Sequence, residues 1–308
     1  MSSGRPQRRL KPKGKNSEKS NLRWQKRDRS EGRQNSGENP EVTQSQVWHC
    51  ARGKTSRRRP DTLAREEPLE IRVRGTAIVV TMRTPGHDDE LAAGFLLGER
   101  VVESASDITA IGHCLNAGIE EAGNVINVFL SPAVRFDLGQ LQRNVFASSS
   151  CGICGKASIG SVHQHFPAVG REVRFRRALL WELSAQLHAA QATFTLTGGN
   201  HAAAIFDQAG RLQVLREDVG RHNAVDKVIG HFFLKGVPAS EHILMVSGRA
   251  SFEIMQKSLA ARIPMVCAIS APSSLAVEFA QASGQTLVGF LREDTLNVYS
   301  HPERLGLK

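Results

Sequence analysis

The feature that most constrains the fold is a series of short apolar segments that alternate with amphipathic ones in the C-terminal half of the chain. Strands are expected at residues 201–207, 211–216, 242–246, 265–269, 286–292 and 296–299. Helices are expected between them, at residues 178–194, 223–234, 251–262 and 273–282. Short apolar strands separated by helices are typical of a mostly parallel sheet covered on both faces. The sequence therefore predicts an α/β sandwich over residues 151–308.

A smaller N-terminal α/β part is expected over residues 61–150. Residues 69–81 alternate apolar with polar or small side chains, as a half-buried strand does, and residues 124–130 form a second strand. Between them, Asp88 or Asp89 is expected to cap a helix with one apolar face, made by Leu91, Ala92, Phe95 and Leu96. Periodicity weakens after residue 131, and the serine-rich residues 147–150 indicate a mobile loop that ends this part.

The first 60 residues differ in composition from the rest. They carry 17 Lys and Arg against 5 Asp and Glu, which leaves 23 against 25 for residues 61–308. Almost no apolar periodicity is present, so this segment cannot bury enough surface to offset its ordering entropy. We expect a disordered basic tail over residues 1–60. Contact of this tail with RNA or an acidic partner stays open, through Arg57–Arg59, Trp24 or Trp48.

The charge and apolar distribution also exclude some classes of protein. Because the basic charge is confined to the tail, nucleic acid is not the expected partner of the folded part. No apolar run approaches the roughly 18 residues of a membrane span, and the N-terminus lacks the apolar segment of a secretory signal. The expectation is a soluble protein of the cytoplasm, without a membrane partner.

The strongest chemical signal is a pair of cysteines, Cys151 and Cys154, in the sequence SSSCGICGK. Small residues surround both thiols, and Lys156 or a following helix could lower a cysteine pKa and favour the reactive thiolate. Four interpretations stay open from the residues alone. They are a zinc site completed by Cys114, His163 or His165, a thioredoxin-like dithiol, a sulfur relay through a persulfide, and an inert pair.

The other cysteines suggest no reactive role. Five cysteines with a single close pair do not look like a disulfide framework. Cys267 lies within an apolar strand and is expected to be a buried small hydrophobe, as is Cys114. Cys50 lies in the basic tail, where reactivity is not expected.

Five motifs, taken in order, resemble the FdhD family of formate dehydrogenase accessory sulfurtransferases over residues 65–308. They are TPGHDDELAAGFL (84–96), SSCGICG (149–155), REDVGRHNAVDK (216–227), SGRASFE (247–253), and GFLR (289–292) followed by NVYSHP (297–302). Each motif alone could arise by chance, but their order is specific.

The resemblance implies a carrier that takes sulfur from a cysteine desulfurase as a persulfide on Cys151, with Cys154 as a supporting thiol. The sulfur would pass to the molybdenum bis(molybdopterin guanine dinucleotide) cofactor before its insertion into the catalytic subunit of formate dehydrogenase. A cytidine-deaminase-like fold and a homodimer are also implied. The deaminase zinc signature is missing, because Ser150 stands where proline is required, so no metal is expected. A chaperone that binds the cofactor without covalent sulfur transfer is the alternative.

The resemblance also implies cofactor contacts at the end of the strand expected at residues 286–292. The residues are Phe290, Leu291, Arg292, Glu293, Asp294 and Thr295. An aromatic face, a guanidinium and carboxylates at a strand end suit a guanine nucleotide, with GDP as the expected surrogate ligand.

Polar residues at two helix starts are harder to assign. One of these helix starts carries a charged cluster, which could belong to the cofactor pocket or be solvated: Asp218, Arg221 and His222. Ser247–Arg249 could bind an anion at a helix N-terminus. Asp226 and Lys227 are most simply a solvated helix face.

Overall fold

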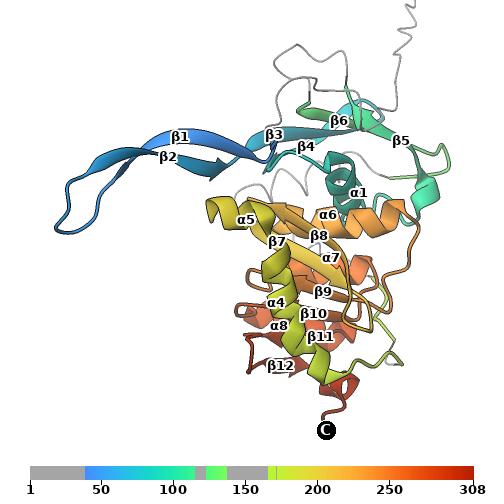
Figure 1. Cartoon of the computed structure of the whole chain (residues 1–308). Helices are drawn as coiled ribbons and strands as arrows, with labels where there is room; N and C mark the ends of the chain where they lie inside the picture. Colours follow the sequence, from blue (N-terminus) through green and yellow to red (C-terminus); the bar gives the residue numbers. More distant parts are fainter. Residues whose placement is uncertain (1–38, 115–122, 137–165, 171) are drawn as a thin grey trace, which may run out of the picture.

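The computed structural model describes residues 39–114, 123–136, 166–170 and 172–308. Two mixed sheets of four and six strands lie on either side of a layer of helices, and a two-stranded hairpin projects from this body (Figure 1). Two hydrophobic cores lie on opposite faces of the six-stranded sheet. In the described ranges, no helix is both long enough and apolar enough to cross a membrane.

The six-stranded sheet has the order β12-β11-β10-β9-β7-β8. Its strands are β7 (His201–Phe206), β8 (Leu212–Asp218), β9 (Ile243–Val246), β10 (Met265–Ala268), β11 (Thr286–Gly289) and β12 (Asn297–Ser300). These bounds confirm the predicted positions, but the prediction of a mostly parallel sheet is wrong. Only β9, β10 and β11 are parallel to one another, whereas β7, β8 and β12 each run antiparallel to their neighbours. Parallel pairing needs a long crossover. The helices at residues 252–260 and 274–283 supply one between β9, β10 and β11, whereas short connections join β7 to β8 and β11 to β12 as antiparallel pairs.

Helices cover both faces of this sheet. One face packs against α6 (Arg221–Leu234), α7 (Phe252–Ala260) and α8 (Ser274–Ser283). The other packs against α4 (Leu180–Ala190), which follows the 3-10 turn η2 (Arg177–Leu179). The helix expected at residues 178–194 is interrupted, because Gln191 leaves the helical region at ψ 78° and the chain continues as the short α5 (Ala192–Thr197).

The four-stranded sheet has the order β4-β3-β6-β5 and forms the N-terminal part. Its strands are β3 (Glu67–Val73), β4 (Thr76–Arg83), β5 (Ile108–His113) and β6 (Val125–Leu130). The single strand expected at residues 69–81 is a hairpin. Arg74 and Gly75, at φ 50° and 82°, make the two-residue turn that suits the twist of antiparallel strands.

Helix α1 (Asp88–Gly98) packs between this sheet and α6 (Figure 1). The prediction that Asp88 or Asp89 caps α1 is wrong, because His87 is the N-cap residue and the Asp88 carboxylate pairs with Arg83 instead. The two helices approach so closely that a Cβ on Gly94 would lie 2.0 Å from the Asp226 carbonyl oxygen. Glycine at this position lets the two helix backbones touch.

Strands β1 (Val42–His49) and β2 (Arg57–Ala64) form the projecting hairpin. The prediction of disorder through residue 60 is therefore wrong for residues 39–60, while residues 1–38 lie outside the described residues. The two strands pair along their whole length, from Val42 with Ala64 to His49 with Arg57, and β2 also contacts α5. Trp48 is 65% exposed, and the Arg58 guanidinium lies 5.7 Å from the centre of its ring.

Candidate functional site

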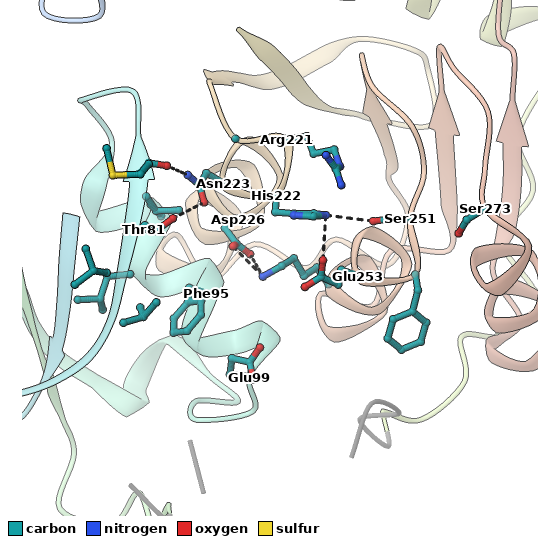
Figure 2. Close-up of a pocket in the computed structure, with 18 of the residues that line it drawn as sticks. Thr81, Phe95, Glu99, Arg221, His222, Asn223, Asp226, Ser251, Glu253 and Ser273 are labelled. Carbon is teal, nitrogen blue, oxygen red and sulfur yellow. Dashed lines mark hydrogen bonds and ion pairs between the residues drawn. The ribbon is translucent and has the colours of Figure 1, made fainter. Parts of the chain in front are cut away.

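A cavity of about 730 Å³ lies where α6, α7 and α8 begin, between these helices, β4 and α1 (Figure 2). The three N-cap residues Gly220, Ser251 and Ser273 all line it. We call it the helix-start cavity. Because a helix N-terminus carries partial positive charge and unpaired N–H groups, three of them around one cavity favour an anionic ligand group.

His222 and Lys257 carry the polar chemistry of the helix-start cavity. Figure 2 shows His222 between Ser251 and Glu253, with its Nε2 at 3.2 Å from the Ser251 hydroxyl and 3.3 Å from a Glu253 carboxylate oxygen. Burial, together with the charges of Lys257 and Arg221, lowers the pKa of His222 to about 3. The imidazole is therefore neutral at physiological pH and able to accept as well as donate a hydrogen bond.

Asp226 and Lys257 form a buried ion pair at the floor of this cavity. The Lys257 ammonium donates to both Asp226 carboxylate oxygens, at 2.8 and 2.9 Å. Burial raises the pKa of Asp226 to about 6, against the opposing effect of Lys257. Burial would lower the pKa of Lys257, but the charges of Asp226 and Glu99 raise it above its ordinary value. The predicted solvated position of Asp226 is wrong.

Lys227, also expected on a solvated face, is 1% exposed. Its ammonium lies 2.7 Å from an oxygen of the fully buried Asp218 and donates to the Thr84 carbonyl at 2.8 Å. Asp218 also accepts from the backbone N–H of Gly220 at 2.8 Å, just before α6 begins. Asp218 is thus a buried structural group, whereas its neighbours Arg221 and His222 line the helix-start cavity.

The motif TPGHDDEL contributes a second buried polar junction. The Arg216 guanidinium donates to Glu90 at 2.6 and 2.9 Å, and His231 Nδ1 lies 2.8 Å from the same carboxylate. Burial would raise the pKa of Glu90, but hydrogen bonds from Arg216 and His231 lower it below its ordinary value. This junction ties α1 to β8 and α6, and sequence reasoning did not foresee it.

Residues 290–295 form an exposed turn between β11 and β12. Phe290 is 41% exposed at φ 50°, and the Arg292 guanidinium donates to the Ile269 carbonyl at 2.6 Å. Glu293, Asp294 and Thr295 are exposed. Leu291 differs from the other expected contact residues, because its side chain is fully buried in the second core and leaves only its backbone for a ligand.

A second cavity, of about 510 Å³, lies at the same edge of the six-stranded sheet but on its opposite face. We call it the α4–α5 cavity. It is lined by Ser184, Leu187, His188, Gln191, Phe194, Gly198, Gly199, Asn200, His201, Ser247 and Ile269. Gly248 separates it from the helix-start cavity, since a Cβ there would lie 3.4 Å from His201 Nδ1 and 3.9 Å from Arg221 Cδ. Of these residues only Ser247 belongs to a motif of the sequence, and the others come from residues 184–201 and from Ile269. The sequence therefore did not reveal this cavity.

The SGRASFE motif lies between the two cavities. The Ser247 hydroxyl accepts from the Ala202 backbone N–H at 2.8 Å and lines the α4–α5 cavity. Ser251 precedes α7, so the predicted helix start is correct to one residue. Arg249 is exposed and lines neither of the two cavities.

Cys151 and Cys154 lie outside the described residues, as do His163 and His165. Of the remaining cysteines, Cys267 is fully buried, as predicted, and burial raises the pKa of its thiol. Cys114 is also buried, whereas Cys50, after β1, is exposed. Within the described part of the chain, no three His, Cys, Asp or Glu side chains are grouped so that they could hold a metal ion.

The fold and site define an α/β protein with two ligand-sized cavities and an exposed turn at one edge of its larger sheet, where the parallel strands end. The model of the FdhD/NarQ family matches residues 64–306. The chain therefore belongs to the FdhD/NarQ family, and the membership predicted from its motifs is confirmed.

Individual proteins support this assignment. The chain is 48% identical over 256 residues to the sulfur carrier protein FdhD of Streptomyces coelicolor, covering 81% of this chain and 91% of that protein. It is 49% identical over 255 residues to that of Mycobacterium tuberculosis, covering 80% and 92%. A crystal structure described as "a putative formate dehydrogenase accessory protein" from Desulfotalea psychrophila matches with a TM-score of 0.66 and 26% identity, covering 86% of this chain and all of the other.

Proposed function

We propose that this protein is a sulfur carrier that supports formate dehydrogenase, with Cys151 as the thiol that accepts sulfur. The observation that carries the proposal is the Cys151–Cys154 pair within a region that matches the family model, in a chain 48–49% identical to proteins named sulfur carriers. A cytoplasmic location, a homodimer and a cytidine-deaminase-like fold remain predictions.

The loading step is a thiol exchange. The Cys151 thiolate attacks the terminal sulfur of a persulfide on a cysteine desulfurase, and a new S–S bond forms on Cys151. The S–S bond of the donor breaks, and the donor cysteine leaves as a thiolate with the electron pair. The product is a persulfide on Cys151, with no change in the total number of electrons.

Delivery as sulfide requires two further electrons, which a second thiolate can supply. Attack of the Cys154 thiolate on the Cys151 sulfur would form a disulfide and release hydrosulfide to the acceptor. The acceptor in this proposal is the molybdenum bis(molybdopterin guanine dinucleotide) cofactor of formate dehydrogenase. Its guanine nucleotide arms would contact residues 290–295, where Phe290 offers an exposed ring and Arg292 a guanidinium.

Intact mass after incubation with a cysteine desulfurase and cysteine tests the proposal. The wild-type protein should gain one sulfur atom, about 32 Da, that a reducing agent removes, and Cys151→Ala should gain none. Cys50→Ala is the matched control, because Cys50 is an exposed thiol of the same chain outside the proposed site. An adduct that persists in Cys151→Ala and disappears in Cys50→Ala would refute the assignment.

The alternative is a chaperone that binds the cofactor without a covalent sulfur step. The observation that favours it is the pair of cavities beside an exposed turn, a large binding surface for a protein whose task is only to pass on one atom. A wild-type protein that never acquires sulfur and still supports formate dehydrogenase would establish the chaperone instead.

A further inference from the structure

The β1–β2 hairpin carries a dense positive charge that no acidic side chain of the described residues neutralises. Residues 42–60 contain five Lys and Arg and no Asp or Glu. All five cations are exposed, and they are Arg52, Lys54, Arg57, Arg58 and Arg59. The ion pairs among the described residues include none of them. Because like charges repel one another, this part of the hairpin is stabilised by contact with an anionic surface.

One face of the hairpin combines this charge with an exposed aromatic ring. Trp48 lies opposite Arg58 across the two strands, so their side chains share a face, and the guanidinium lies over the indole ring. Gln46 and Pro60 form the next pair on this face, and all four residues are exposed. Trp and Arg are among the residue types that contribute most to binding energy at protein interfaces. This face therefore suits a partner protein.

The body of the protein holds the hairpin at its base. Strand β2 packs against α5, and the Thr193 hydroxyl donates a hydrogen bond to Glu41. The Arg65 guanidinium donates to the Val42 carbonyl at 3.2 Å. The far end of the hairpin extends away from the body (Figure 1). A two-stranded hairpin is only marginally stable by itself in water, so a partner that packs against the far end would also stabilise it.

The base of the hairpin adjoins the α4–α5 cavity. A Cβ on Gly199, which lines this cavity, would lie 3.2 Å from the Cβ of Ala64 in β2. Ile269 lines the same cavity, and its carbonyl accepts the hydrogen bond from Arg292 in the turn at residues 290–295. A partner that extends from the hairpin to its base therefore reaches the rim of this cavity and the turn beside it.

We propose that the β1–β2 hairpin docks onto an acidic surface of the catalytic subunit of formate dehydrogenase. This inference rests on the proposed function, in which that subunit receives the cofactor held at residues 290–295. A protein partner is favoured over nucleic acid, because residues 61–308 carry 23 Lys and Arg against 25 Asp and Glu and would repel an extended polyanion. The match to the family model begins at residue 64, so the hairpin adds a binding surface to the matched region.

Surface plasmon resonance with the immobilised catalytic subunit, free of cofactor, tests the inference on the full chain. A variant with Arg57→Glu, Arg58→Glu and Arg59→Glu together should bind the subunit about tenfold or more weakly than the wild type. Raising the ionic strength from about 0.05 to about 0.5 M should weaken the wild-type complex more than the complex of this variant.

A matched control makes the same change in net charge on the body of the protein, and it should bind the subunit nearly as the wild type does. Its three substitutions are at exposed positions, and they are Arg135→Glu, Arg176→Glu and Lys235→Glu.

Two further variants separate side-chain contact from net charge. Trp48→Ala leaves the charge unchanged and should weaken binding by about tenfold or more. A shortened hairpin, in which an Asn-Gly turn joins Ser45 directly to Asp61, removes the far end and should abolish binding. Sulfur loading from a cysteine desulfurase and thermal unfolding should be close to those of the wild type in every variant, which shows that the body remains folded.

Three results would overturn the inference. They are wild-type protein that does not bind the subunit, equal binding by the charge-reversed variant and the wild type, and a hairpin that binds the desulfurase or a single-stranded RNA in place of the subunit. Wild-type protein that binds the subunit through the hairpin but never accepts sulfur would contradict the proposed sulfur carrier and leave the docking surface standing. Normal sulfur loading with subunit binding that does not depend on the hairpin would do the reverse.

Discussion

Replacing Lys227 with methionine should destabilise the protein strongly, although Lys227 touches neither cavity. The change keeps the aliphatic stem and removes the ammonium that pairs with Asp218 at 2.7 Å. Asp218 is fully buried, so its carboxylate would remain without a compensating cation. Breaking a buried pair on one side costs about 3–5 kcal/mol of unfolding free energy.

The hydrogen bonds that remain on Asp218 place the expected loss of unfolding free energy at the lower end of this range. Its carboxylate still accepts from the backbone N–H groups of Thr84 and Gly220, at 3.2 and 2.8 Å, and from the Asn223 amide at 3.0 Å. These donors stabilise the negative charge but do not neutralise it. We therefore expect a loss of about 3 kcal/mol, and a double variant with Asp218→Asn that is less destabilised than the sum of the two single variants.

Urea unfolding followed by far-ultraviolet circular dichroism measures this loss. Lys235→Met is the matched control, because Lys235 is exposed just after the same helix, α6, and should change stability by less than about 0.5 kcal/mol. A Lys227→Met protein within about 1 kcal/mol of the wild type would show that the Lys227–Asp218 pair does not stabilise the fold in this way. Strictly additive effects in the double variant would show the same.

Three further predictions follow from the described contacts. The pKa of His222 is about 3 in the folded protein and about 6.5 when unfolded, so its contribution to stability is full above pH 6.5 and is lost as the pH falls toward 3. His222→Gln should therefore make the pH dependence of urea stability shallower by about one proton in that range, and a slope equal to that of the wild type would contradict this. Phe290→Ala and Arg292→Ala should each weaken GDP binding in calorimetry by about tenfold or more, from lost stacking or a lost phosphate contact; equal affinities would place the nucleotide elsewhere. A protein that begins at Asn39 keeps the β1–β2 hairpin and should accept sulfur as the full chain does by intact mass, whereas a folded truncated protein without uptake would show that the tail recruits the donor.

The sequence predicted most elements of the larger sheet because buried strands leave a simple pattern. Residues such as 243–246 and 265–268 are uninterrupted apolar runs, and the amphipathic segments between them could only be helices. The direction of the flanking strands was not predictable in this way, because apolar content carries no sign of direction. The hairpin at Arg74 and Gly75 was missed for a related reason, since alternation continued through the turn.

The burial of charged residues on α6 could not be predicted from the sequence. Asp226 and Lys227 are adjacent on α6, and charged neighbours on a helix usually face water. Their partners, Lys257 on α7 and Asp218 on β8, are distant in the chain, so only the tertiary arrangement reveals two buried ion pairs. The α4–α5 cavity could not be predicted for the same reason, because only the fold brings the residues that line it, such as Asn200, together.

The proposed function depends above all on the route of the sulfur atom through Cys151. The most direct measurement is a single-turnover transfer in which protein loaded with radioactive sulfur is mixed with formate dehydrogenase that carries its cofactor without sulfide. We expect the label to leave the wild-type protein and to appear in the dehydrogenase together with formate oxidation. Cys151→Ala should transfer no label and restore no activity. Activity that appears while the label remains on the wild-type protein would contradict this route.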